Sequence, residues 1–261
     1  MENVNKTLYI PLYGKSYVSQ KGIILRDEKA EEIWAAEGFP LKGKSKSKWL
    51  AYYMGMRSAA FDRWTAQQLE ANPEAVVLHL GCGMDSRVLR IKNHGAAWFD
   101  VDFPEVIAER RRYFAESNGY TMVSSDVQDL GWMDAVPKGG CGIVVMEGIS
   151  MYLQPEALKT LLQAIRSHFD RVHILMDSYS VFAAKATKYK NPIKEVGVTQ
   201  VYGMDDPCVL EAAGLRFLAE QELTPEDMIQ QLQGLEQMVF RKLYAGPMAK
   251  KLYRMYEFTE A

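Results

Sequence analysis

The sequence predicts a doubly wound α/β fold whose sheet is mostly parallel. Three observations support this prediction: short apolar runs that alternate with helical segments, a glycine-rich turn after the first of these runs, and a length of 261 residues. Runs that are apolar throughout are typical of strands buried on both faces, as in parallel sheets covered by helices. Single domains of this class often reach this length.

The first 72 residues are predicted to be mostly helical and to form a cap. Apolar residues recur at helical spacing from Asp27 to Ala36 and again from Lys48 to about Asn72. The segment 42–48 between them alternates lysine with glycine and serine. It predicts a solvated loop, with a lid over an anionic substrate as the alternative.

Strands and helices alternate in the rest of the chain. The predicted strands are 75–80, 96–101, 120–123, 141–146, 172–176, 215–219 and 252–258. Helices are expected from about Ser86, from Pro104, over 155–169 and from a cap at 224–227. No linker divides the chain, so we expect a single domain over 1–261, with the sheet core at 73–261 and a lid insertion near 187–210.

Composition restricts the classes of partner. The net charge of -2, from 31 basic and 33 acidic residues, provides no general attraction for nucleic acid. Cys82, Cys141 and Cys208 lie too far apart for a disulfide framework or a zinc cluster. No signal peptide and no apolar run of about 20 residues is present. We therefore expect a soluble, cytoplasmic protein without metal, nucleic acid or membrane partners, whose oligomeric state stays open.

The chemistry is expected where the parallel strands end. Gly81 and Gly83 follow the first strand and permit a sharp turn and a close backbone approach to a ligand. Gly-x-Gly alone is a weak signal. It is strengthened by Asp102, which ends the second strand 19 residues after Gly83, where a carboxylate commonly binds ribose hydroxyls.

Two residues in this turn argue against a nicotinamide dinucleotide. The dinucleotide fingerprint continues with a third glycine or alanine, whereas this chain has Ser86 at that position. Asp85 precedes it, and a carboxylate would repel the pyrophosphate that normally lies at the helix N-terminus. A nicotinamide oxidoreductase is therefore the weaker alternative, and a cofactor without phosphate is favoured.

Acidic residues also follow the third and fourth strands. Asp126 with the apolar Val127 suits an adenine. Glu147 ends an apolar strand, where a buried charge is costly unless a cation compensates it. The ammonium or sulfonium of a cofactor is one such cation.

The motifs around these residues resemble a known family. The segments VLHLGCGMDSR at 77–87, FDVDFPEV at 99–106 and MEGISMYL at 146–153 resemble the leucine carboxyl methyltransferase superfamily, in particular its bacterial polyketide O-methyltransferase-like branch. The similarity extends to TLYIPLYGK at 7–15 and RSAAFD at 57–62. It implies a Rossmann-like class I methyltransferase fold with S-adenosylmethionine as cofactor.

The resemblance also implies a role for each cofactor-binding residue. Arg57 and Lys15 engage the carboxylate of the cofactor, and the loop Gly81, Cys82 and Gly83 cradles its methionine part. The remaining matches are Asp102 to the ribose ligand, Asp126 and Val127 to the adenine site, and Glu147 to the acid that closes the pocket near the methionyl end.

The predicted reaction is methyl transfer to a hydroxyl or carboxyl oxygen of a small molecule, polyketide-like or phenolic. Three polar residues lie at strand ends that face the expected cleft: Tyr152, Asp177 and Tyr179. The residues themselves do not decide among the three, and Tyr152 is taken as the catalytic candidate. A phenol, with a pKa of about 10, needs a base, whereas a carboxylic acid, near 4, arrives ionised. The alternatives are a protein C-terminal carboxyl methyltransferase and a non-catalytic S-adenosylmethionine-binding protein.

The cap and the lid are predicted to cover the acceptor pocket. Their aromatic residues suit a flat, partly apolar acceptor, although ordinary packing of the extra helices on the sheet is an equal alternative. These residues are Tyr13, Tyr17, Tyr189 and Tyr202.

Overall fold

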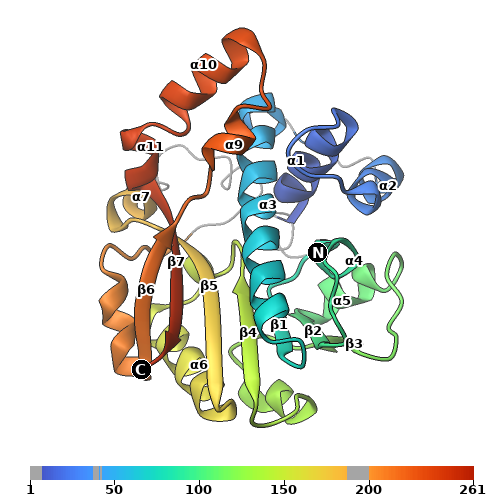
Figure 1. Ribbon diagram of the computed structural model, residues 1–261, viewed down its shortest axis with the longest axis vertical. Coiled ribbons are helices and arrows are strands. Elements are labelled where there is room, and N and C mark those ends of the chain that lie inside the picture. Colours follow the sequence, from blue (N-terminus) through green and yellow to red (C-terminus); the bar gives the residue numbers. More distant parts are fainter. Residues whose placement is uncertain (1–7, 38–40, 42, 187–199) are drawn as a thin grey trace.

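The computed structural model describes residues 8–37, 41, 43–186 and 200–261. A seven-stranded sheet in the order β3-β2-β1-β4-β5-β7-β6 forms its centre (Figure 1). The first five strands are mutually parallel, and β7 runs antiparallel to both β5 and β6. The predicted α/β class with a mostly parallel, doubly wound sheet is confirmed.

Each strand predicted from the sequence is present, with small shifts of its ends. The strands are β1 (Val76–Leu80), β2 (Ala97–Asp102), β3 (Tyr120–Ser124), β4 (Cys141–Met146), β5 (Arg171–Tyr179), β6 (Leu215–Gln221) and β7 (Tyr253–Glu260). The largest difference is the end of β5, expected at residue 176. It continues to Tyr179 because 177–179 pair with 253–255 of β7, a partner remote in sequence.

The helices agree less completely with the sequence prediction. They are α1 (Tyr9–Gln20), α2 (Glu28–Glu37), α3 (Lys48–Ala71), α4 (Arg87–Arg90), α5 (Pro104–Arg110), α6 (Pro155–His168), α7 (Val181–Ala186), α9 (Glu226–Ile229), α10 (Gly234–Leu243) and α11 (Pro247–Leu252). The boundaries of α1, α7, α10 and α11 were not predicted, and α4 is a single turn. Most of the lysine-rich loop, 43–46, is a 3-10 helix. The first part of the predicted lid insertion, 187–199, lies outside the described residues.

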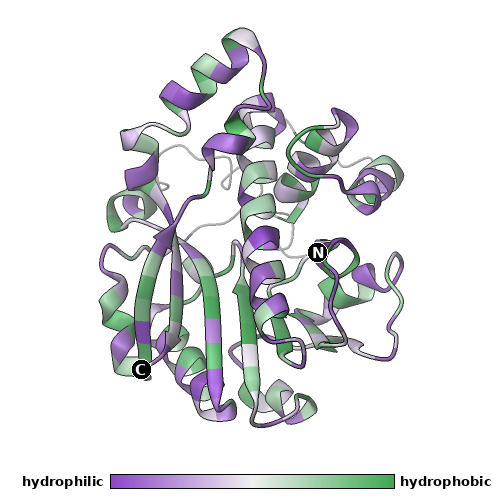
Figure 2. Ribbon diagram, viewed as in Figure 1, coloured by the Kyte–Doolittle hydropathy of each residue, from purple (hydrophilic) through white to green (hydrophobic). Residues whose placement is uncertain are grey.

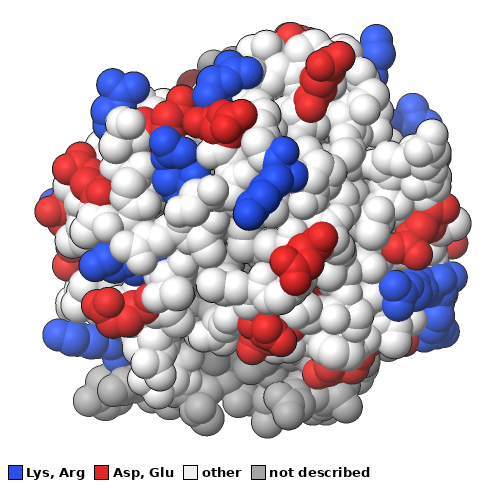
Figure 3. All heavy atoms as spheres, turned by 90° about the horizontal axis from the view of Figure 1, so that it is seen from below, with Lys and Arg blue, Asp and Glu red and all other residues white. Residues whose placement is uncertain are grey.

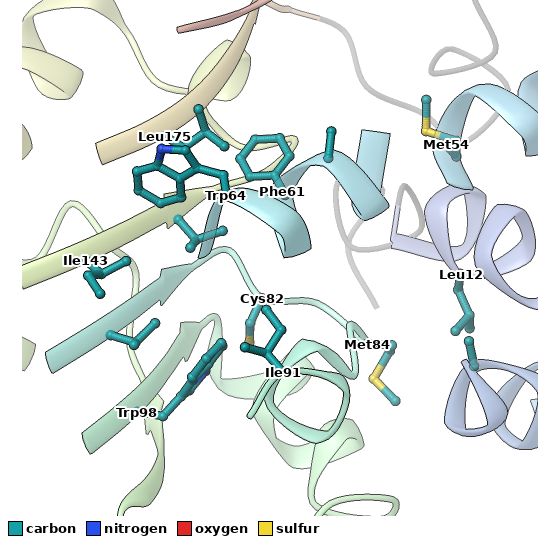
Figure 4. Close-up of a cluster of buried hydrophobic side chains, with 14 of the residues drawn as sticks. Leu12, Met54, Phe61, Trp64, Cys82, Met84, Ile91, Trp98, Ile143 and Leu175 are labelled. Carbon is teal, nitrogen blue, oxygen red and sulfur yellow. The ribbon is translucent and has the colours of Figure 1, made fainter. Parts of the chain in front are cut away.

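Apolar layers cover both faces of the sheet. Alternate residues of a strand point to opposite faces, and every residue of β1 and β4 is buried. Most of β4 has the hydrophobic colour in Figure 2. On one face Ile143 and Leu175 pack with Phe61 and Trp64 of α3 (Figure 4). On the other face, strand residues pack with Leu162 and other residues of α6. This double coverage is the reason for the continuous apolar runs in the sequence.

The helices before the sheet form a connected group. α1 packs along α3 and against α2, and α3 crosses the sheet near β4 and β5. α10 and α11 lie beyond the sheet at the end of the molecule where α3 begins (Figure 1). Among the described helices, none is long and apolar enough to cross a membrane.

Candidate functional site

A cavity of about 610 Å³ lies at the edge of the sheet where the parallel strands end. Its wall contains the residue that directly follows each of four strands: Gly81 after β1, Phe103 after β2, Ser125 after β3 and Glu147 after β4. Helices α1, α3, α10 and α11 supply further parts of the wall. Ligand sites span roughly 300–1,000 Å³, and open parallel sheets bind ligands at this edge. This cavity is the candidate site.

The turn after β1 requires glycine. Gly81 and Gly83 have φ values of +65° and +51°, in the left-handed region that glycine adopts without penalty. A Cβ on Gly81 would also lie 2.7 Å from Cδ1 of Ile149. Cys82 between them is buried, and burial raises its pKa well above the usual value. Its thiol is therefore a packing group rather than a nucleophile.

Asp102 connects the ends of β1 and β2. One carboxylate oxygen accepts the N–H of Gly83 at 2.7 Å and the other accepts the N–H of Phe103 at 2.8 Å. Burial raises the pKa of Asp102, and these two backbone hydrogen bonds oppose the rise. Each carboxylate oxygen can accept a further hydrogen bond, and Asp102 lies in the cavity wall.

Asp126 and Val127 form the wall next to the end of β3. The N–H of Ser125 donates to the backbone oxygen of Asp102 at 2.9 Å, which fixes this loop beside β2. Asp126 caps its own turn by accepting the N–H of Gln128 at 2.9 Å. Val127 is buried. Asp126, Val127 and Asp102 thus lie in the wall of the same cavity.

Lys15 and Asp85 form a buried ion pair at 2.7 Å between α1 and the glycine turn. Asp85 also pairs with Arg90 at 3.0 Å. Burial favours the neutral acid, but Arg90, Lys15 and Arg87 together hold the pKa of Asp85 well below its usual range. Its charge is compensated, so the repulsion of a pyrophosphate that the sequence indicated is weaker than expected.

Arg57 is held by three groups from distant parts of the chain. Its Nε donates to Glu147 at 3.0 Å, and its NH1 donates to the Tyr253 hydroxyl at 3.2 Å. NH1 also lies 3.4 Å from Oδ2 of Asp177. Glu147 has a second cation, Arg87, at 2.5 Å. Burial opposes ionisation of Glu147, but the two arginines keep its pKa below the usual value.

A wider set of buried ion pairs supports these residues, and sequence reasoning missed it. Arg87 and Arg90 from α4 both bind Asp62 of α3, at 2.6 and 2.7 Å. Arg90 also binds Asp27 at 2.6 Å, just before α2. The side chains come from three separate segments, so no local pattern indicated the set. It fastens the helical segment to α4, which follows β1 at the edge of the sheet where the parallel strands end.

The other half of the cavity is largely apolar and rich in tyrosine. Its wall includes Tyr152 and Tyr179, as predicted, but Asp177 is not among the described wall residues. Sequence reasoning missed other wall residues, among them Leu50, Tyr53, Met54, Leu243, Tyr244, Met248, Leu252 and Tyr253. An adjoining cavity of about 200 Å³ shares Tyr53, Tyr244 and Tyr253 with it.

Three of the four tyrosines expected to line this part of the cavity are absent from its described wall. Tyr13 and Tyr17 pack against each other, with ring centroids 5.8 Å apart, and are not part of the described wall. The ring of Tyr13 also packs against Trp34 of α2 at 5.1 Å. Tyr202 is likewise absent from the described wall, and Tyr189 lies outside the described residues. For Tyr13 and Tyr17, packing among the helices was the correct alternative.

The outer surface carries both signs of charge. On the face in Figure 3, basic and acidic side chains are interspersed, in keeping with the near-zero net charge of -2.

The sequence is similar to a known protein family and to two characterised methyltransferases. The profile of the leucine carboxyl methyltransferase family matches residues 6–166. The tetracenomycin polyketide synthesis O-methyltransferase TcmP of Streptomyces glaucescens is 27% identical over 263 residues, which cover 99% of this chain and 97% of that protein. The S-adenosyl-L-methionine-dependent methyltransferase dpfgK of Gibberella zeae is 32% identical over 192 residues, covering 67% and 64%.

Solved structures share the fold at low sequence identity. Magnesium protoporphyrin IX methyltransferase from Synechocystis PCC 6803 with bound SAH has a TM-score of 0.52 and 14% identity, covering 90% of this chain and 94% of that one. An S-adenosylmethionine-dependent methyltransferase from Mesorhizobium loti has a TM-score of 0.51 and 11% identity, covering 76% and 98%. Both have the same general arrangement of sheet and helices.

Proposed function

The chain belongs to the leucine carboxyl methyltransferase family and is an S-adenosylmethionine-dependent methyltransferase, and we propose that it methylates a hydroxyl or carboxyl oxygen of a small molecule, polyketide-like or phenolic. The observation that carries the choice of acceptor is the tyrosine-rich, apolar half of the cavity. The full-length relative named for polyketide synthesis supports the same class.

The other half of the cavity fits the cofactor. S-adenosylmethionine presents a carboxylate, an ammonium, a ribose and an adenine. Lys15 and Arg57 are basic wall residues that suit the carboxylate, and the left-handed turn at Gly81 and Gly83 leaves room for the methionine part. Asp102 suits the ribose hydroxyls.

Further wall residues suit the adenine and the methionyl end of S-adenosylmethionine. Asp126, Val127 and Phe103 provide a polar group beside an apolar surface for the adenine. Glu147, kept ionised by its two arginines, closes the methionyl end and supplies negative potential near the cationic groups of the ligand. Cys82 contributes its backbone to the turn, since its side chain is buried.

The acceptor half can hold a flat, partly apolar molecule. Aromatic side chains give a large apolar surface and a polar hydroxyl at one end. Leu243 and Met248 from α10 and α11 border this half and are exposed to solvent. A bulky apolar acceptor would cover them, which excludes water from the site of transfer.

The chemistry of the bound cofactor is methyl donation from an activated sulfonium. The protein residues orient the acceptor oxygen and exclude water. Tyr152 and Tyr179 lie in the wall, which supports a role in hydrogen bonding to an acceptor, whereas Asp177 contacts Arg57 and Tyr253 and is not part of the described wall. We assign Tyr152 as the residue that contacts the acceptor oxygen. A phenolic acceptor loses its proton during transfer, whereas a carboxylic acid enters ionised.

The test is a comparison of turnover at matched cofactor concentrations. Small aromatic phenols, small aromatic carboxylic acids and peptides with a free C-terminal carboxylate serve as the three acceptor classes. We expect turnover on the small molecules and a reduced rate in Tyr152→Phe, with Tyr113→Phe, outside the cavity wall, as the control. Activity on the peptides alone would transfer the protein to the protein-methylating class. Cofactor binding without turnover on any panel member would support a non-catalytic role.

A further inference from the structure

Arg57 is the shared partner of two buried carboxylates. Glu147 and Asp177 both lie within ion-pair distance of it, at 3.0 and 3.4 Å. The two acids are not equivalent, because Glu147 has Arg87 as a second cation at 2.5 Å. Within the described part of the chain, the cation that faces Asp177 is Arg57. When Arg57 is engaged elsewhere, Asp177 loses its compensating charge.

The two carboxylate oxygens of Asp177 differ in their hydrogen bonding. Its Oδ1 accepts the N–H of Gly148 at 2.7 Å. Its Oδ2 is buried and has no partner at full hydrogen-bond geometry within the described part of the chain. Arg57 NH1 lies 3.4 Å from it, and the Tyr253 hydroxyl is close enough to lower the pKa of Asp177 by hydrogen bonding. A buried oxygen of this kind is costly as an anion and is a suitable site for a proton.

The groups that face Asp177 come from every element packed against it. They are Arg57 and Tyr53 of α3, Glu147 and the Gly148 N–H after β4, Tyr179 of β5 and Tyr253 of β7. Burial raises the pKa of Asp177 to about 6; Glu147 adds to the rise, and Arg57 opposes it. The pKa of Asp177 therefore depends on whether Arg57 remains paired with it.

Binding of the cofactor changes that availability. In the proposed function the methionine carboxylate pairs with Arg57, so this inference rests on that assignment. A third carboxylate at one guanidinium leaves an excess of negative charge in a buried place. We propose that Asp177 takes up a proton from solvent at Oδ2 when the cofactor binds, which frees Arg57 to bind the methionine carboxylate. Asp177 is thus a positioning residue that acts through Arg57.

The proposal fixes the sign of the pH dependence. An acid whose pKa is higher in the complex than in the free protein binds protons as the complex forms. Affinity is then greatest below the pKa of the free protein and declines as the pH rises toward the pKa in the complex. One linked proton gives at most about a tenfold loss of affinity per pH unit.

Calorimetry with S-adenosylhomocysteine measures this proton directly. This ligand retains the carboxylate and lacks the sulfonium charge. Titrations at about pH 7 in phosphate and in Tris, which differ in ionisation enthalpy, give the number of protons bound from the change in apparent enthalpy. We expect net uptake of up to about one proton in the parent protein and a clearly smaller value in Asp177→Asn. Asp134→Asn, an exposed control, should match the parent.

Ligand binding and proton uptake are separate results of this calorimetry, and they test the cofactor site and the role of Asp177 respectively. Absence of S-adenosylhomocysteine binding to the folded parent would contradict the cofactor site itself. Binding with no proton uptake, or with release, would overturn the role of Asp177 and leave the site intact. If Asp177→Asn does not fold, the parent alone decides: uptake should approach zero at about pH 5, where Asp177 is already protonated. Uptake that is unchanged at that pH would assign the proton to another group.

Discussion

Replacing Arg57 by lysine tests the cofactor site most directly. The guanidinium uses Nε for Glu147 and NH1 for Tyr253, and it also faces Asp177. A lysine ammonium keeps the charge but cannot reproduce the planar set of donors for two acids and a ligand carboxylate. Alanine would be a poorer test, because leaving a buried acid without its cation costs about 3–5 kcal/mol of stability.

The structure sets the size of the expected effect. A hydrogen bond to a charged group contributes about 1.5–3 kcal/mol. Loss of one such bond to the methionine carboxylate in Arg57→Lys therefore weakens binding by roughly 10- to 150-fold. Isothermal titration calorimetry with S-adenosylmethionine measures the loss, and circular dichroism on heating establishes that the variant is folded.

A control on the same helix makes the result specific. Arg63 of α3 forms an exposed ion pair with Asp227 at 2.6 Å. Exposed pairs contribute about 0–1 kcal/mol, so Arg63→Lys should leave cofactor affinity near that of the parent. Equal affinity of the folded Arg57→Lys variant and the parent would refute the assignment of Arg57 to the methionine carboxylate.

Three further predictions concern the remaining parts of the site and the core. Asp102→Ala should weaken S-adenosylmethionine binding by about 1–3 kcal/mol in calorimetry; unchanged affinity in a folded variant would remove this residue from the ribose site. Gly81→Ala should lower the free energy of unfolding in urea by more than Gly95→Ala does. Both glycines have positive φ, but only at Gly81 would the added Cβ lie 2.7 Å from another side chain. Equal losses of stability would show that this contact relaxes freely. Burial opposes ionisation of Asp100, but Arg110 and further partners lower its pKa to about 2. Its folded pKa is depressed, so about 2 kcal/mol of stability is present above about pH 4 and is lost as the pH falls to about 2; urea unfolding should show a smaller acid loss in Asp100→Asn than in the parent.

Local patterns were sufficient for the strands and for the position of the glycine turn in the candidate site. Continuous apolar runs identified the central strands, because a strand buried on both faces must be apolar at consecutive positions. The last strand, 252–258, was identified instead by alternation of apolar and polar residues. The glycine turn and Asp102 were found because both lie beside a strand end, where the fold class places ligands. Helices were harder to predict. α10 buries Phe240 but exposes Leu235, Met238 and Leu243, so most of its apolar residues do not pack on the core.

The sequence by itself determined the fold class, the order of the strands along the chain and the acids that follow them. The tertiary structure decided where β7 lies, antiparallel between β5 and β6, and thereby placed Tyr253 beside Arg57, 196 residues away. It also decided that Lys15 meets Asp85 across 70 residues, and that Arg57 is shared by Glu147 and Asp177. Periodicity records which face of an element is apolar. The partners of a buried charge depend on how distant elements pack, and no local pattern records that.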